Sequence, residues 1–213
     1  MTTPRTLVVT AHPDPASLTH RAAAELLDLL PPGSTEVAHL AQEGFDPRFT
    51  LSDHLTYRGL APTSAAVQAE QRRVDAADHV VLVFPVHWWS FPALLKGWVD
   101  RVLIAGWAFD PGTDGRIAPR LQDRTLHLLP LAGATADSWG RRGYDRAFAT
   151  QVEVGIAGFC GMRTGVTAFV HDSEADPGTT ARAIREAAAQ IAAGIDAGAR
   201  RSADSVTPAS CCA

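Results

Sequence analysis

Three loops in this chain carry residue types that can bind a ligand, and the first begins at His12. It reads HPDPASLTH after the apolar run TLVVTA, so a proline-stiffened turn leads from a strand-like segment into a helical one. Backbone N–H groups and hydroxyls converge at such a helix N-terminus and bind anions there. His12, Ser17 and Thr19 are therefore candidates to hold a phosphate or pyrophosphate. The alternative is a helix that Ser17 merely caps, since the loop is neither glycine-rich nor of the GxGxxG type.

The second loop lies within FPVHWWSFP and contains two adjacent tryptophans. Large aromatic side chains in a loop can form the wall of a pocket for a flat ring, and backbone amides of the same loop can hydrogen-bond the edge of that ring. The alternative places the tryptophans in the core or at a dimer interface, where aromatic residues are enriched. The residues that would line the pocket are Pro85, Val86, His87, Trp88 and Trp89.

The third loop, LAGATADSWG, is made mostly of small residues. Small side chains let the backbone approach a ligand closely, which makes Leu131, Ala132, Gly133 and Ala134 candidates for a second contact with it. Trp139 could stack on or flank a ring. A flexible surface loop explains the same residues equally well.

The helix after the second loop has two structural features. Lys96 and Asp100 stand four residues apart, as in a surface ion pair worth a few tenths of a kcal/mol. Gly97 costs about 1 kcal/mol against alanine inside a helix, which indicates that another chain segment approaches it. Elsewhere the sequence contains no GxSxG elbow, no CxxC pair and no metal-spaced His/Cys set.

Apolar runs and helical patterns alternate along the chain. The runs that predict strands are 6–11, 35–40, 79–84, 124–131 and 164–170. The segments that predict helices are 17–30, 63–77, 92–102, 147–160 and 179–195. Residues 41–62 carry Gly, Pro, Asp and aromatic side chains without clear periodicity, and we expect a long loop there.

This alternation predicts an α/β fold, a doubly wound five-stranded parallel sheet with helices on both faces. In such sheets ligands bind outside the carboxyl ends of the strands, so chemistry is expected just after Thr10, Phe84 and Leu131. No repeat or linker divides the chain. We expect one domain over residues 1–198 and a disordered polar tail over 199–213.

Bulk properties narrow the classes of partner. The net charge of −4 and the pI near 6.0 give no reason to expect nucleic acid. The N-terminus does not read as a signal peptide and no apolar stretch approaches a membrane span, so we expect no membrane insertion and a cytoplasmic location. Of the three cysteines, Cys160 fits a buried apolar position, whereas Cys211 and Cys212 fall in the tail and their role stays open.

The run FPVHWWSFPALLKGWVDRV resembles the NAD(P)H:quinone oxidoreductase family, which includes bacterial drug-activity modulators and the ancillary proteins of potassium-efflux systems. It matches the family pattern FP-x-x-W-[aromatic/small]-x-P-A-x-[LM]-K-G-W-x-[DE]-R-V almost position for position, with three residues instead of two between Trp88 and Pro92. VVTAHPDPASLTH is similar to the family's A-H-P-x-x-x-S-x-[NT] segment, and GATADSW…GY…GFCGM is a weaker match. Order and spacing fit from about residue 5 to residue 172.

The resemblance implies a flavodoxin-like fold with FMN or FAD at the carboxyl edge of the sheet. It places the flavin phosphate beside His12, Ser17 and Thr19, and the isoalloxazine against residues 85–89, with residues 131–134 as the second flavin loop. It implies ping-pong chemistry, in which a nicotinamide cofactor, NAD(P)H, gives a hydride to the flavin and an acceptor such as a quinone then takes one. It also implies a homodimer, to which the density of Trp and Phe between Phe84 and Phe109 adds a hint.

This chain departs from the family at two places. The family's T-[ST]-G-G is LAGA at residues 131–134, so two hydroxyl contacts to the flavin are absent. Trp139 stands where animal quinone reductases have a tyrosine, and Asp145 stands less surely at the position of a histidine. An indole donates a hydrogen bond but does not usefully lose a proton. The role of that tyrosine and histidine in managing the charge on the reduced flavin therefore does not carry over, and the catalytic residues stay unknown.

Two functions from different classes remain open. The first is an enzyme, an NAD(P)H:acceptor oxidoreductase of the NAD(P)H dehydrogenase (quinone) type. The second is a flavin-binding regulatory partner of a membrane transporter such as a potassium-efflux system. A one-electron carrier is disfavoured because carriers of this fold are shorter and more acidic. The sequence does not decide between FMN and FAD, between NADH and NADPH, or among electron acceptors.

Overall fold

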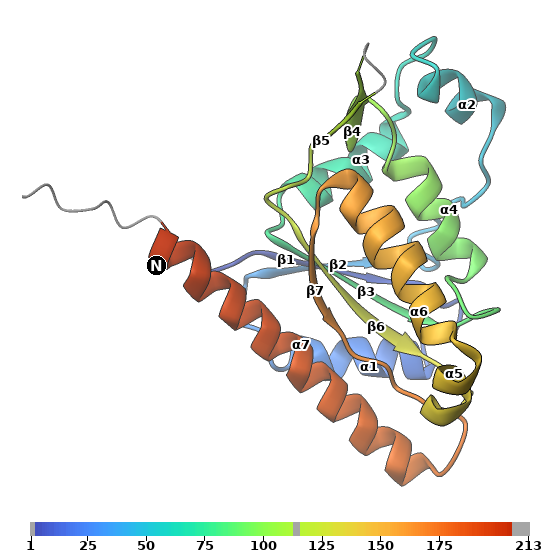
Figure 1. Ribbon diagram of the computed structural model, residues 1–213, viewed down its shortest axis with the longest axis vertical. Coiled ribbons are helices and arrows are strands. Elements are labelled where there is room, and N and C mark those ends of the chain that lie inside the picture. The colour runs from blue at the N-terminus through green and yellow to red at the C-terminus, as the bar shows by residue number, and fades with distance from the viewer. Residues whose placement is uncertain (1–2, 113–115, 206–213) are drawn as a thin grey trace, which may run out of the picture.

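The computed structural model describes residues 3–112 and 116–205, with side chains to residue 198. Its main sheet is parallel throughout, in the order β2-β1-β3-β6-β7 (Figure 1). The predicted doubly wound five-stranded sheet is therefore confirmed. The strands are β1 (Thr6–Thr10), β2 (Thr35–His39), β3 (His79–Pro85), β6 (Thr125–Leu131) and β7 (Arg163–Thr167).

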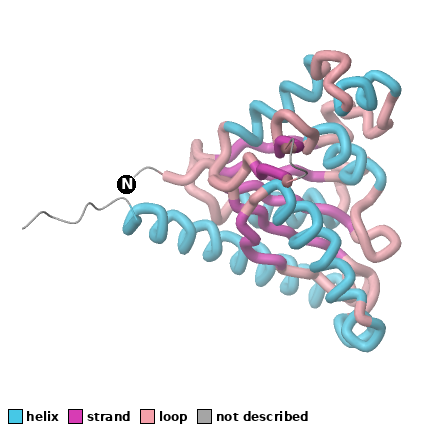
Figure 2. Tube along the Cα trace, turned by 45° about the horizontal axis from the view of Figure 1, so that its top comes forward, coloured by secondary structure: helices cyan, strands magenta, loops and turns pink. Residues whose placement is uncertain are grey.

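Helices cover both faces of the sheet (Figures 1 and 2). α1 (Leu18–Leu27) and the long α7 (Pro177–Ser205) pack against each other and against one face. The other face carries α3 (Ala65–Asp75), α4 (Ala93–Val102), α6 (Tyr144–Ala149) and the π-helix η1 (Thr150–Gly158). Because strand side chains alternate between faces, Val8 enters the first core whereas Leu7 and Val9 enter the second.

Four elements were not expected from the sequence. Residues 41–62 contain α2 (Leu51–Tyr57), so the prediction of an uninterrupted loop there is wrong. Thr50 and Asp53 form a capping box at its start, a signal that the sequence does contain. The others are the antiparallel pair β4 (Phe109–Pro111) and β5 (Ile117–Pro119), and α5 (Ala136–Arg142).

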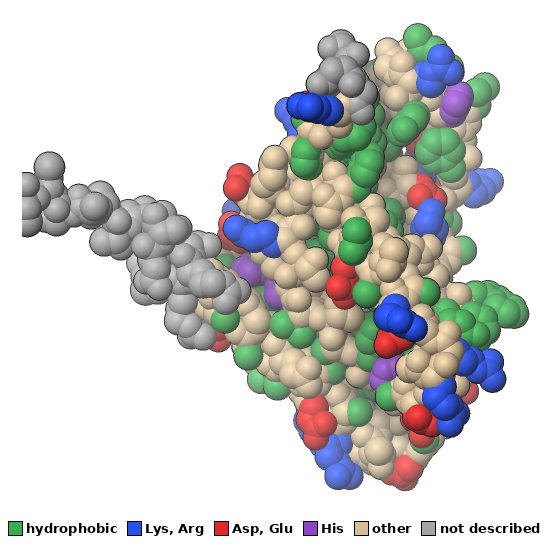
Figure 3. All heavy atoms as spheres, viewed as in Figure 1, with side chains coloured by type: hydrophobic (Ala, Val, Ile, Leu, Met, Phe, Trp, Pro, Cys, Tyr) green, Lys and Arg blue, Asp and Glu red, His purple; other side chains and the backbone are tan. Residues whose placement is uncertain are grey.

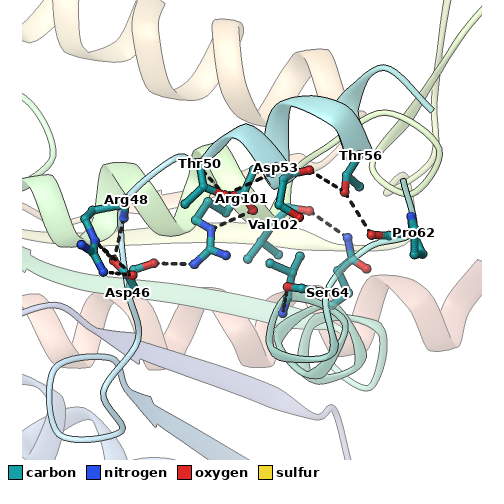
Figure 4. A network of polar contacts seen from close by, with 12 residues as sticks. Asp46, Arg48, Thr50, Asp53, Thr56, Pro62, Ser64, Arg101 and Val102 are labelled. Carbon is teal, nitrogen blue, oxygen red and sulfur yellow. Dashed lines mark hydrogen bonds and ion pairs between the residues drawn. The ribbon is translucent and has the colours of Figure 1, made fainter. Parts of the chain in front are cut away.

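A polar network binds the segment before and within α2 to α4 (Figure 4). Arg101 of α4 donates to the Asp53 carboxylate at 3.0 Å and to the Asp46 carbonyl oxygen. Pro47 lies directly on Gly97, where an added Cβ would stand 2.1 Å from the Pro47 oxygen. The close approach predicted at Gly97 is thus confirmed. Lys96 and Asp100 also form the expected pair, at 2.6 Å.

The C-terminal third differs from the sequence prediction in its helices. The predicted helix 147–160 is α6 followed without a break by η1, and such π-helical segments occur often at functional sites. α7 continues to Ser205, past the predicted end at Ile195, so residues 199–205 are helical rather than part of a disordered tail. The rest of the predicted tail, with Cys211 and Cys212, lies outside the described residues.

Cys160 is buried as expected, with 3% of its surface exposed. Burial raises the pKa of its thiol to about 11, which keeps it protonated and unreactive at neutral pH. In the described part of the chain, none of the helices combines the length and apolar character needed to cross a bilayer.

Candidate functional site

The three predicted loops meet at the carboxyl edge of the sheet. Ala11 N–H donates to the Val83 oxygen at 3.2 Å, which places the first loop beside β3. Val86 N–H donates to the Leu131 oxygen at 2.8 Å, which joins the second loop to the third. The strand order changes direction between β1 and β3, and the crevice at such a point is where doubly wound sheets bind ligands.

The first loop presents donors at the N-terminus of α1. Ser17 caps the helix and accepts from the His20 N–H, and the amides of Leu18 and Thr19 have no acceptor within the helix. His12 Nδ1 lies 3.1 Å from the Asp14 amide nitrogen and 3.3 Å from the Asp14 carbonyl oxygen. Because the amide can only donate and makes the shorter contact, Nδ1 accepts, and neutral His12 carries its proton on Nε2 and can donate it outward. Thr19 is only 2% exposed, so its hydroxyl lies beneath the surface of this loop.

The second loop is a tight turn in a strained conformation. His87 and Ser90 exchange two backbone hydrogen bonds of 3.1 and 3.0 Å across it. The central residues Trp88 and Trp89 have φ of 50° and 59°, the left-handed region that type I′ turns fill with Asn or Gly. Two bulky residues held there cost free energy, and strain of this kind collects at functional sites.

Both tryptophans lie at the surface rather than in the core. Trp88 is 87% exposed and Trp89 is 37% exposed. Their amides donate no hydrogen bond within the described residues, so the turn offers two N–H groups next to two indole rings. Ser90 Oγ donates to Gln151 Oε1 at 2.8 Å and ties the turn to η1.

The third loop is held by the chain that follows β7. Ser173 N–H donates to the Ala132 oxygen at 3.1 Å, and Asp172 N–H donates to the Ala134 oxygen at 3.2 Å. Leu131 and Ala132 are buried, whereas Gly133 is exposed and its amide donates to no described group. Gly133 and the half-buried Ala134 are therefore the part of this loop that a ligand can reach.

Trp139 does not flank an open pocket. It is 2% exposed and packs edge-on or tilted against four rings, those of Tyr144, Phe148, Phe169 and His171. Its Nε1–H is buried and has no hydrogen-bond acceptor among the residues that the structure describes. Asp145 is exposed on α6.

Comparison with known proteins now assigns the family. The sequence matches a family model described as a flavodoxin-like fold over residues 4–195. The ribosyldihydronicotinamide dehydrogenase (quinone) of Rattus norvegicus is 34% identical over 184 residues, which cover 75% of this chain and 78% of the relative. The chain belongs to the NAD(P)H:quinone oxidoreductase family. The sequence-based assignment to this family of enzymes is confirmed.

Solved structures agree on the fold. The NAD(P)H:quinone oxidoreductase of Methanothermobacter marburgensis superposes with a TM-score of 0.78 at 21% identity, covering 92% of this chain and 96% of its own. An FMN-dependent NADH-azoreductase of Bacillus anthracis, solved in complex with FMN, has a TM-score of 0.64 at 19% identity and covers 93% and 99%.

Two residues near the site were missed by the sequence analysis. Tyr144 stacks on Trp89 with ring centroids 4.5 Å apart. His171 follows Val170, which bridges to Leu131, and its Nδ1 lies 3.3 Å from the Ala134 oxygen. Burial lowers the pKa of His171, and the Ala134 carbonyl offsets part of that effect. A signal for His171 exists in the sequence, because ligands bind at the carboxyl ends of parallel strands and His171 directly follows the fifth predicted strand.

Two cavities lie away from this edge. One, of about 250 Å³, is bordered by α2, α4, β4 and η1 and lined by residues that include Tyr57, Phe109 and Phe159. A smaller and more polar one lies at the amino end of β1 and β2. Within the described residues, no three His, Cys, Asp or Glu side chains come together as ligands for a metal.

Proposed function

We propose that the protein is a flavin-dependent NAD(P)H oxidoreductase that reduces quinones or related acceptors by two-electron, ping-pong hydride transfer. The observation that carries this is the strained Trp88–Trp89 turn. It presents two indoles, and two amides that donate to no described group, at the crevice between β1 and β3. A turn with this cost and this position suits a planar ring with polar edges. Cytoplasmic location is part of the proposal.

The donor set fits a flavin phosphate and ring. The amides that open α1, the Ser17 hydroxyl and His12 Nε2–H would hold FMN phosphate or FAD pyrophosphate. The amides of Trp88 and Trp89 would contact the polar edge of the isoalloxazine, and Pro85 to His87 would lie beneath it. Gly133 and Ala134 would approach the ring from the third loop, where the absence of side-chain hydroxyls leaves backbone amides as donors.

A bound flavin supplies the hydride chemistry, accepting from a dihydronicotinamide and donating to the acceptor. The residues of this chain orient and desolvate the reactants. Tyr144 fixes the Trp89 indole, and the segment from His171 to Ser173 fixes the third loop through the carbonyls of Ala132 and Ala134. Because the rat relative's name specifies a ribosyl dihydronicotinamide, that donor belongs in the assay beside NADH and NADPH.

The decisive experiment begins with the molecule released when the purified protein is denatured. Mass spectrometry should identify FMN or FAD, and the colourless protein should regain yellow colour and thermal stability when that flavin is added back. The loaded protein should then oxidise one of the three donors rapidly with a simple quinone. A protein that stays colourless and gains no thermal stability with excess FMN and FAD would overturn the proposal.

The same assay separates the enzyme from a transporter-regulating flavoprotein. Rapid turnover with quinone supports the enzyme, whereas tight flavin binding with negligible turnover supports the regulator. The quinone-reductase relatives favour the enzyme.

We also propose a homodimer. Exposed apolar side chains line the 250 Å³ cavity beside α4, among them Tyr57 (51% exposed) and Phe159 (44%). Val154 (69% exposed) lies on η1, which borders the same cavity. Hydrophobic side chains gather on this part of the surface, near α2, β4 and α4 (Figure 3). Contiguous apolar surface of this kind is typical of an interface between protein chains.

A further inference from the structure

A group of histidines surrounds the first loop, and only one of them, His12, belongs to the predicted site. His20, in the first turn of α1, has its Nδ1 3.1 Å from Ser17 Oγ. The ring of His39, at the end of β2, lies 5.1 Å from the ring of His20. His39 in turn has its Nδ1 2.8 Å from Thr10 Oγ1. The two imidazoles thus contact hydroxyls on either side of the first loop, at the N-terminus of α1 and at the carboxyl end of β1.

Gln42 determines which nitrogen of neutral His20 carries the proton. Its Nε2 donates to the carbonyl oxygens of His12 and Pro13, at 3.4 and 3.3 Å, and these two acceptors fix the orientation of the amide. Its Oε1 therefore faces His20 Nε2, at 3.2 Å. Since that oxygen only accepts, His20 Nε2 must hold a hydrogen. Neutral His20 then has a bare Nδ1, which can only accept.

The Ser17 hydroxyl responds to this arrangement. While His20 is neutral, the hydroxyl donates its only proton to His20 Nδ1 and has none to offer a ligand. When His20 takes up a second proton, Nδ1–H donates to Ser17 Oγ instead. The Ser17 proton is then free to point out of the loop, and a positive charge stands beside the N-terminus of α1.

We propose that His20 is a positioning residue that couples binding of the flavin phosphate at Ser17 to the uptake of one proton. The inference rests on the proposed flavin function and adds a residue and a pH dependence to it. Only the phosphate-bearing part of the ligand is concerned, because the coupling acts through the Ser17 hydroxyl and through charge.

Several charged and titratable groups surround His20. Burial lowers the pKa of His39, a charge on His20 lowers it further, and Glu43 offsets part of this, so protonation of His20 disfavours protonation of His39. Glu43 accepts from the His39 N–H at 2.9 Å and is paired with Arg73, which neutralises its charge. On the loop side, the Asp14 carboxylate accepts from the Ala16 N–H and His12 accepts from the Asp14 N–H.

The sign of the coupling follows from linkage. An anion that binds beside His20 stabilises its protonated form, so protonation strengthens binding of the anion to the same degree. Affinity should rise as the pH falls, by up to about tenfold per pH unit for one proton. Riboflavin, which has the ring but no phosphate, should not show this dependence.

The test compares dissociation constants of FAD and riboflavin, measured by flavin fluorescence between about pH 8 and about pH 6. FAD is used because the phosphate of FMN itself gains a proton near pH 6. Wild-type protein should bind FAD about tenfold more tightly at the lower pH, relative to riboflavin. His20→Phe keeps a ring against His39 but has no nitrogen, and it should remove this tenfold effect of pH on FAD affinity. His54→Gln, an exposed histidine on α2, should leave it unchanged.

A second variant tests the same coupling if His20→Phe does not fold. Gln42→Glu places a carboxylate at His20 Nε2, which favours the imidazolium and should move the pH midpoint of FAD binding upward by about one unit. FAD binding with the same pH profile as riboflavin, or with a profile that neither variant alters, would overturn the role of His20 while the flavin function stands. Failure to bind any flavin at any pH would overturn the proposed function, and this inference with it.

Discussion

The indole of Trp89 stacks on the phenol ring of Tyr144, with centroids 4.5 Å apart and planes 26° apart. Trp89 belongs to the turn after β3, and Tyr144 begins α6 directly after Gly143, the left-handed residue that ends α5. The contact therefore joins the second loop to the segment that follows the third. It limits the freedom of a turn that is already strained, and this fixes where the Trp88 and Trp89 amides point.

Replacement of Tyr144 tests that role. Tyr144→Leu removes the stacking partner, and we expect flavin affinity to fall about tenfold, since a pair of stacked rings contributes about 0.5–1.5 kcal/mol. Tyr144→Phe keeps the ring and should bind flavin as the wild type does. Titration of each apoprotein with flavin measures the difference. Equal losses in both variants would show that the hydroxyl matters and the stack does not.

Strain in the turn predicts opposite effects on stability and binding. Trp88→Gly removes a left-handed bulky residue whose side chain is 87% exposed, so the free energy of unfolding should rise by about 1 kcal/mol. Flavin affinity should fall because the indole is lost and the turn becomes flexible. Trp88→Ala loses the same indole but retains the strain, and serves as the matched control. Urea unfolding of the apoproteins checks this, and the idea fails if the two variants have equal stability.

Gly97 should tolerate no side chain. A Cβ at this position would lie 2.1 Å from the Pro47 oxygen and 2.5 Å from the Pro47 Cβ. Gly97→Ala must push the segment around Pro47 off α4, and we expect a loss of about 2–3 kcal/mol in the free energy of unfolding. Gly140→Ala, in α5 where an added Cβ meets nothing within 4 Å, should be neutral or stabilising. A Gly97→Ala variant as stable as the wild type, or more stable, would show that helix propensity and not contact with Pro47 governs position 97.

The sheet and two of its loops could be predicted because the sequence signals for them lie within the segments themselves. Buried parallel strands such as His79–Pro85 are continuous apolar runs, and the rule that ligands bind at carboxyl ends then places Ser17 and Trp88 at one edge. Gly97 revealed a contact through its cost in a helix. The partner, Pro47, could not be identified, because it depends on how a distant segment lies across α4.

The remaining differences arise from tertiary contacts. Trp139 was expected near a ligand ring, but the aromatic side chains of α6 and the β7 end enclose it, and sequence periodicity does not report such enclosure. α2 is short and mostly exposed, so it has no apolar stripe to reveal it. The left-handed turn at Trp88 has no sequence signal, since its residues are the reverse of those that such turns prefer.

The apolar surface beside α4 predicts the oligomeric state. Val154 is 69% exposed on η1, and a buried aspartate at an interface would carry an unpaired charge. Val154→Asp should therefore convert a dimer into a monomer at micromolar concentration, as measured by light scattering with size-exclusion chromatography. Leu29→Asp, an exposed apolar residue just after α1 on the opposite side of the sheet, should leave the dimer intact. A wild-type monomer would contradict the dimer outright.

His79 and His127 form a buried pair away from the candidate site, and this pair predicts how stability depends on pH. Val166 N–H donates to His127 Nδ1 at 3.0 Å, so neutral His127 holds its proton on Nε2, which lies 3.0 Å from His79 Nδ1. Burial, and secondarily His79, lowers the pKa of His127 to about 3. In the unfolded chain the same residue titrates near pH 6.5.

The unfolded state therefore gains this proton first as the pH falls. Stability from neutral His127 is complete above about pH 6.5 and decreases below it, by about 1.4 kcal/mol per pH unit for one proton. His39 and His171, whose pKa values burial also lowers, add to the wild-type slope. His127→Gln should lower the free energy of unfolding at neutral pH. Between about pH 6 and about pH 5, that free energy should fall less steeply with pH than in the wild type, by about 1.4 kcal/mol per pH unit. Urea unfolding at several pH values measures it, and parallel curves for the two proteins would show that His127 does not titrate on unfolding.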